Sequence, residues 1–139
     1  KWVQPMAEVL AELGCSHALV VHGADGLDEI TLTGESHIAE LKNGKIKNYK
    51  IDPDELGLEM CFSEDLKGGT PEENAAMIEG ILKSQTGPKR DIVVLNAAAA
   101  IYVAGKAKSI KLGVACATES IDSGKALEKL KDLCKISNS

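Results

Sequence analysis

Two adjacent residues, Asn43 and Gly44, constrain the fold of this chain more than any other feature of its sequence. An Asn-Gly pair between alternating apolar residues predicts a β-hairpin with a two-residue turn, because these residues tolerate the positive φ angles that such a turn needs. The length of the turn also sets which residues of the two strands face each other. The expected opposed residues are two apolar pairs and one charge pair: Leu41 with Ile46, Ile38 with Tyr49, and Glu40 with Lys47.

Helices are predicted on both sides of this hairpin. Pro5 suits a first helical turn, and the apolar residues after it indicate a short amphipathic helix that Gly14 can end. These apolar residues, at helical spacing, are Met6, Val9, Leu10 and Leu13. Further along, residues 70–73 (Thr-Pro-Glu-Glu) form a capping box with proline at the first helical position, and Gly87-Pro88 ends the helix that this box begins.

Two more helices are expected in the last third of the chain. Residues 90–105 are apolar nearly all round, which indicates a buried element, and its length favours a helix over a strand. A final amphipathic helix is expected to turn one apolar set inward: Ala126, Leu130, Leu133 and Cys134. Strands in the first part and helices in the second predict a single mixed α/β (α+β) domain over residues 1–139.

An acidic loop follows the apolar run 18–21 and is the first candidate for a functional site. Residues 22–29 read HGADGLDE, so a strand delivers Asp28 and Glu29 into a loop that contains two glycines. In open α/β sheets, ligands collect beyond the carboxyl ends of the strands. After the loop, residues 30–33 alternate between apolar and polar, as a half-buried strand does.

The adjacent carboxylates of Asp28 and Glu29 predict a cation site. Two negative charges about 5 Å apart repel by roughly 3 kcal/mol at an effective dielectric near 20, and a divalent cation removes that repulsion. Carboxylate oxygens suit Mg²⁺, which takes one or two protein carboxylates and completes its shell with water and phosphate. From the residues alone, a solvated acidic surface loop explains the pair equally well. Asp25 is a further candidate ligand, whereas His22 is expected to be a structural hydrogen-bonding residue.

The composition limits the classes of function. With 139 residues, 44% of them hydrophobic, the chain can bury a core, and a net charge of -5 argues against a nucleic-acid partner. The four cysteines show no metal-binding spacing and suit buried, reduced thiols, which favours the cytoplasm. No apolar stretch is long enough to predict a membrane span. Lys1 stands where an initiator Met is expected, which indicates processing or excision from a longer chain.

Five segments of the sequence, taken in order, resemble the anthranilate phosphoribosyltransferase family. They are residues 22–29 (HGADGLDE), 68–75 (GGTPEENA), 87–91 (GPKRD), 95–105 (LNAAAAIYVAG) and 121–124 (IDSG). The resemblance covers nearly the whole chain but only the carboxyl-terminal part of the family's longer polypeptide. A GTGGD-type diphosphate loop, a KHGNR-type segment and the family's amino-terminal helical domain find no counterpart here.

The resemblance implies a nucleoside phosphorylase/phosphoribosyltransferase-type α/β domain that acts in tryptophan biosynthesis. The implied reaction transfers phosphoribose from phosphoribosyl diphosphate to anthranilate, with Mg²⁺ held by the residues that match the family's acidic pair, Asp28 and Glu29. Asn96 and Tyr102 are interpreted as residues that anchor neighbouring elements. The isolated chain is expected to be inactive, and to associate either with itself or with the missing amino-terminal part.

Two other functions stay open on the sequence. A non-catalytic binding module could use the same fold, because fold does not determine chemistry. A relative of the pyrimidine nucleoside phosphorylases is the third interpretation, although phosphorolysis does not require a paired acidic metal site.

Overall fold

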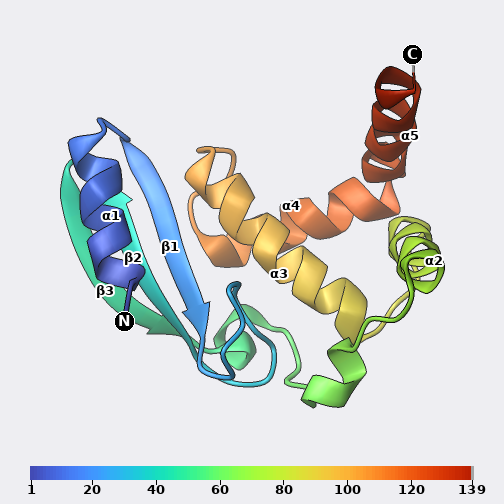
Figure 1. Ribbon diagram of the computed structural model, residues 1–139, viewed down its shortest axis with the longest axis horizontal. Coiled ribbons are helices and arrows are strands. Elements are labelled where there is room, and N and C mark those ends of the chain that lie inside the picture. Colours follow the sequence, from blue (N-terminus) through green and yellow to red (C-terminus); the bar gives the residue numbers. More distant parts are fainter. Residues whose placement is uncertain (139) are drawn as a thin grey trace.

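The computed structural model describes residues 1–138 and has a mixed α/β fold, as the sequence predicts. Three strands precede four of the five α-helices (Figure 1). In chain order the elements are α1 (Val3–Glu12), β1 (His17–Gly23), β2 (Ser36–Lys42), β3 (Lys45–Ile51), the 3₁₀ turns η1 (Pro53–Leu56) and η2 (Ser63–Leu66), α2 (Pro71–Leu82), α3 (Pro88–Val103), α4 (Ile110–Asp122) and α5 (Lys125–Ser137).

The three strands form one antiparallel sheet in the order β1-β2-β3. The turn between β2 and β3 is the predicted one, with φ of 51° at Asn43 and 74° at Gly44. The predicted register is confirmed at all three pairs, Leu41 with Ile46, Glu40 with Lys47 and Ile38 with Tyr49. The turn chemistry and the side-chain pattern therefore specify the same hairpin.

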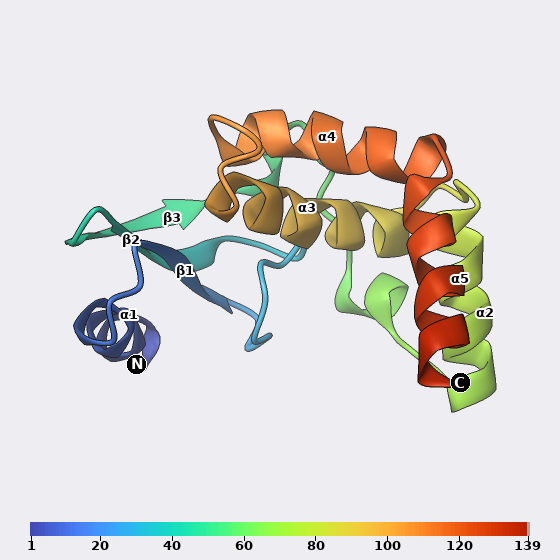
Figure 2. The ribbon, with the colours of Figure 1, turned by 90° about the horizontal axis from the view of Figure 1, so that it is seen from above.

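Both faces of the sheet are covered. Figure 2 shows α1 on one side of the strands and α3 with α4 on the other. This arrangement explains the four consecutive buried residues 38–41 of β2, because neighbouring side chains on a strand point to opposite faces. Ile38 packs in the core that the sheet shares with α3. Ala39 and Leu41 point to the opposite face of the sheet and are fully buried as well.

Helix α3 connects the two hydrophobic clusters of the molecule. Leu95, Ala98 and Ala99 pack against the sheet, and Val94 contacts the cluster that α4 completes with Ala117 and Ile121. The helix expected over residues 90–105 is confirmed, with bounds Pro88–Val103, but it is buried only in part, since Val93 is 41% exposed. Helices α2 and α5 lie side by side at the end of the molecule away from the sheet (Figures 1 and 2).

The helix start predicted at Thr70-Pro71 is confirmed, but the helix end predicted at Gly87-Pro88 is wrong, because α2 ends at Leu82 and Pro88 begins α3. Thr70 accepts a hydrogen bond from the backbone N–H of Glu73, and the Glu73 carboxylate accepts one from the backbone N–H of Thr70. Gly14 adopts φ of 83° just after α1, where a left-handed residue ends a helix.

The strand expected over residues 30–33 is wrong. This segment has no strand pairing, and Thr31 is as fully buried as its apolar neighbours Ile30 and Leu32. The reason is that side chains satisfy its backbone: Thr31 N–H donates to the Ser36 hydroxyl at 3.0 Å, and Asn96 holds Ile30. Apolar-polar alternation here reflects an irregular buried segment.

Several apolar residues that were expected to face inward are exposed. In α5, Ala126 and Leu130 are half-buried but Leu133 and Cys134 are exposed, because the last turns of the helix extend past their neighbours (Figure 1). Of the apolar set predicted for the first helix, Met6, Val9 and Leu13 are exposed and Leu10 is half-buried, while the buried contact of α1 is made by Ala7. Buried thiols are not found either: Cys116 is exposed like Cys134, and Cys15 and Cys61 are only half-buried.

Candidate functional site

The acidic loop begins where β1 ends, at Gly23. A Cβ atom at this position would lie 2.4 Å from the Asp25 carboxylate and 3.1 Å from Thr31 Cβ, so the close approach of the loop to the strand end requires glycine. The loop spans residues 24–35 and returns to Ser36, the cross-strand partner of Gly23. The loop therefore extends from the end of the β1–β2 pair at which Gly23 and Ser36 lie.

Asp25 organises the loop from within. Its carboxylate accepts hydrogen bonds from the hydroxyls of Thr31 and Thr33, each at 2.6 Å, and from the backbone N–H of Leu27 at 3.1 Å. Burial acts to raise the pKa of Asp25, but these hydrogen bonds outweigh it and hold that pKa below its ordinary value. The Asp25 side chain is thus engaged by its own loop, which argues against its use as a third metal ligand.

Asp28 and Glu29 are both exposed in this loop. Partial burial raises the pKa of Glu29, and the negative charges of Asp28 and Asp25 raise it further. Within residues 1–138, no ion pair includes Asp28 or Glu29 and no side chain donates a hydrogen bond to either carboxylate. The loop therefore concentrates negative charge that the rest of the described chain leaves uncompensated.

The donor set fits a hard divalent cation that needs few protein ligands. In the described part of the chain, no cluster of three or more His, Cys, Asp or Glu residues is arranged to hold a metal ion. A site with four protein ligands, as for structural zinc, is therefore not formed by these residues. Two adjacent carboxylates suit Mg²⁺, which keeps several waters and binds phosphate oxygens. Asp28 also lines a hollow of about 320 Å³ beside the first residues of α1.

The backbone on both sides of the acidic pair is held by hydrogen bonds. The Leu27 carbonyl accepts from the Gly23 N–H at 2.9 Å and from His22 Nδ1 at 3.1 Å, which gives His22 the structural role expected for it. On the other side, Asn96 of α3 bonds both the N–H and the carbonyl of Ile30. The interpretation of Asn96 as an anchoring residue is confirmed, and the structure identifies what it anchors.

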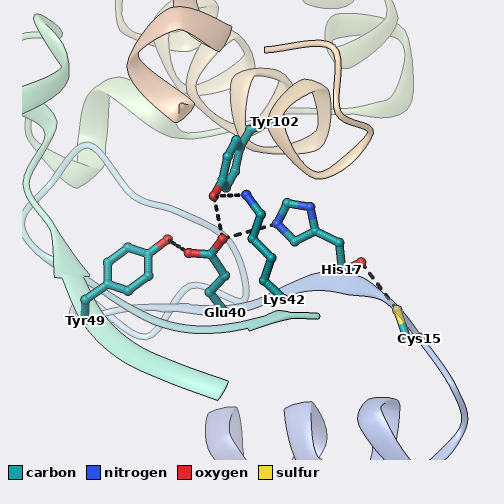
Figure 3. A network of polar contacts seen from close by, with 6 residues as sticks. All are labelled: Cys15, His17, Glu40, Lys42, Tyr49 and Tyr102. Atoms are coloured by element: carbon teal, nitrogen blue, oxygen red, sulfur yellow. Dashed lines mark hydrogen bonds and ion pairs between the residues drawn. The ribbon is translucent and has the colours of Figure 1, made fainter. Parts of the chain in front are cut away.

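A second polar cluster, at the opposite end of β1, was not foreseen (Figure 3). The Glu40 carboxylate accepts hydrogen bonds from Tyr102 at 2.5 Å and from Tyr49 at 3.1 Å, and lies 3.2 Å from Nε2 of His17. Lys42 donates to the Tyr102 hydroxyl at 3.0 Å. Tyr102 thus anchors α3 to the sheet, as interpreted from the sequence.

Burial acts to raise the pKa of Glu40, yet its hydrogen bonds from Tyr102, Tyr49 and His17 lower that pKa below the ordinary value. Burial and the Glu40 charge raise the pKa of Tyr49, which keeps its hydroxyl protonated as a donor. These residues satisfy one another, so the cluster is a structural clamp between the hairpin and α3. No sequence motif links the five residues, because they come from three strands and one helix.

Comparison with known proteins identifies what the chain is similar to. The sequence model described as "Glycosyl transferase family, a/b domain" matches residues 1–127. The anthranilate phosphoribosyltransferase of Bradyrhizobium sp. is 52% identical over 139 residues, which are 100% of this chain and 41% of that relative. The chain therefore spans about two fifths of the length of the curated relatives it matches.

Solved structures show the same fold. The crystal structure of anthranilate phosphoribosyltransferase from Thermus thermophilus has a TM-score of 0.86 and 46% identity, and covers 94% of this chain and 38% of that one. The Saccharomyces cerevisiae enzyme, described in complex with PRPP and Mg, has a TM-score of 0.84 and 26% identity over 93% of this chain and 38% of its own. These matches confirm the resemblance predicted from the five motifs.

Proposed function

This chain belongs to the glycosyl transferase family, in which it matches the a/b domain, and from that membership we propose that it forms part of an anthranilate phosphoribosyltransferase. In this proposal it is the carboxyl-terminal part of the catalytic α/β domain. The intact enzyme transfers phosphoribose from phosphoribosyl diphosphate to anthranilate, with Mg²⁺, in tryptophan biosynthesis. Support comes from the 52% identical relative of that name and from the yeast enzyme described with PRPP and Mg.

The observation that carries the proposal is the uncompensated charge of Asp28 and Glu29 in the acidic loop. Asp28 and Glu29 are exposed side by side, and their mutual repulsion contributes to the raised pKa of Glu29. Such repulsion favours uptake of a cation, because a divalent ion turns two repelling charges into two ligands. A diphosphate substrate brings such a cation with it.

Asp28 and Glu29 would hold Mg²⁺ through carboxylate oxygens, leaving positions for water and for phosphate oxygens. When bound, the ion would supply charge stabilisation to the departing diphosphate. The remaining residues of the loop would orient the two ligands: Asp25 closes the loop through Thr31 and Thr33, and Gly23 permits its tight approach to β1.

We further propose that the chain is inactive by itself and works in the cytoplasm. These 139 residues contain no GTGGD-type diphosphate loop and no KHGNR-type segment, and the relatives are more than twice as long. Apolar side chains in and beside α1 are exposed and available for association with further chain: Trp2, Met6, Val9 and Leu13. All four cysteines carry free thiols, which suits a reducing compartment. No helix among residues 1–138 has both the length and the apolar character to cross a membrane.

The test is complementation in solution. The chain is assayed for phosphoribosylanthranilate formation alone and mixed with the part of the Bradyrhizobium relative that lies outside the matched region. We expect turnover only in the mixture, and we expect Asp28→Asn/Glu29→Gln to lower it by about a hundredfold or more, since the metal ligands are lost.

The matched control is a second Asp-Glu pair in the same chain. Asp54 and Glu55 are also adjacent and exposed, but they lie in η1. Asp54→Asn/Glu55→Gln removes the same charge and should leave turnover within about twofold of wild type. If both double variants behave alike, or if turnover in the mixture needs no divalent cation, the metal role is refuted. A mixture without any turnover would favour a binding module.

A further inference from the structure

Asp28 and Glu29 lie between Leu27 and Ile30, and the backbone N–H and carbonyl groups of both flanking residues are hydrogen-bonded. On the amino-terminal side, the Leu27 N–H donates to Asp25, and the Leu27 carbonyl accepts from Gly23 and His22. On the carboxyl-terminal side, both backbone groups of Ile30 bond to one side chain, that of Asn96. Only residues 28 and 29 lie between these two fixed points.

Asn96 holds Ile30 in a defined orientation. Its Oδ1 accepts from the Ile30 N–H at 3.0 Å, and its Nδ2 donates to the Ile30 carbonyl at 2.8 Å. Nδ2 also donates to the Ile92 carbonyl at 3.0 Å, one turn earlier in α3. An amide rotated by 180° would set its NH₂ group against the Ile30 N–H, so the three partners together fix the amide orientation.

This contact joins the acidic loop to helix α3. Ile30 is 1% exposed and Asn96 is half-buried, so the bonds between them are partly shielded from water. Helix α3 packs in both hydrophobic clusters, so the position of Asn96 is fixed by close packing of its helix. A pair of bonds to the N–H and the carbonyl of one residue restrains the direction of the backbone as well as its position.

We propose that Asn96 is a positioning residue for the Asp28–Glu29 metal site: by fixing Ile30, it sets the direction in which Glu29 and Asp28 leave the loop. The proposal rests on the function proposed above. Asn96 does not touch the ion or the substrate in this account. It acts as residues behind metal ligands commonly do, where substitution lowers metal affinity by about 10- to 100-fold.

The test uses the 139-residue chain with Mn²⁺ as the probe, followed by paramagnetic broadening of backbone amide signals. In wild type we expect broadening centred on residues 28 and 29, abolished by Asp28→Asn/Glu29→Gln. Asn96→Leu keeps the number and branching of the side-chain heavy atoms but neither hydrogen-bonding group, and we expect it to weaken Mn²⁺ binding by about tenfold or more.

Tyr102→Phe is the matched control for general loosening of α3. It removes a hydrogen bond from the same helix to the sheet, at Glu40, but leaves Ile30 untouched. We expect it to destabilise the chain while keeping Mn²⁺ affinity within about twofold of wild type. Equal loss of affinity in both variants, or wild-type affinity in Asn96→Leu, overturns the positioning role alone. Wild type that takes up no Mn²⁺ at residues 28 and 29 overturns the metal site, and the positioning role with it.

A measurement on the wild-type chain covers the case in which Asn96→Leu does not fold. Binding and anchoring are linked, so metal should strengthen the contact that positions its ligands. Saturating Mg²⁺ should slow hydrogen exchange of the Ile30 amide and of the Asn96 side-chain NH₂ by several-fold, with no change at the Tyr49 amide in β3. Unchanged exchange at Ile30 and Asn96 when Mg²⁺ is bound refutes the proposal.

Discussion

Replacing Glu40 by glutamine is expected to destabilise the fold strongly, because the carboxylate is the acceptor that holds the hairpin to α3. Glu40 is 9% exposed and has three donors around it, from Tyr102, Tyr49 and His17. In Glu40→Gln one of its two oxygens becomes an NH₂ group, so at least one of these donors loses its acceptor and faces another donor.

The magnitude follows from the hydrogen bonds that are lost. Bonds to a charged group contribute roughly 1.5–3 kcal/mol each, and a buried donor left without an acceptor costs about 1–3 kcal/mol. We therefore expect Glu40→Gln to lower the free energy of unfolding by about 2–4 kcal/mol, measured by urea denaturation followed by circular dichroism at neutral pH. Glu35→Gln, in the exposed ion pair with Lys50, is the control and should change stability little.

The effect should also depend on pH in a defined direction. The folded state lowers the pKa of Glu40 below its ordinary value of 4.5, so the stabilisation is complete above that value and is lost as the pH falls toward the folded pKa. The difference between wild type and Glu40→Gln should therefore shrink as the pH falls below 4.5. A cost below about 1 kcal/mol at neutral pH, or a difference that grows on acidification, would refute the account of Glu40 as a charged acceptor.

Two further predictions concern glycines. Gly113→Ala should cost about 1–3 kcal/mol in the same urea assay, because its Cβ would lie 2.5 Å from the Ala98 carbonyl oxygen and force α3 and α4 apart; an unchanged unfolding midpoint would contradict this close packing. Gly44→Ala should cost about 1 kcal/mol, because alanine is strained at φ of 74° although nothing blocks its Cβ, and a neutral result would mean that the turn changes its conformation.

The parts of this structure that depend on near neighbours in the sequence could be predicted from it. The Asn43-Gly44 turn, the register of β2 and β3 and the capping box at Thr70 each involve residues a few positions apart, and all are confirmed. The position of Asp28 and Glu29 just beyond a strand is also local information, because Gly23 ends β1 and begins the loop. Local geometry has few solutions for such residues, so the sequence alone specifies it.

Tertiary packing alone decided the features that join distant segments. Asn96 bonds to Ile30 across 66 positions and Tyr102 to Glu40 across 62, so no periodicity or spacing encodes either contact. For the same reason the alternation at residues 30–33 was misread: Thr31 is buried because Asp25 and Ser36 supply the hydrogen bonds that a neighbouring strand was expected to provide. A sequence states which groups need partners, whereas only the folded arrangement determines which partners come within reach.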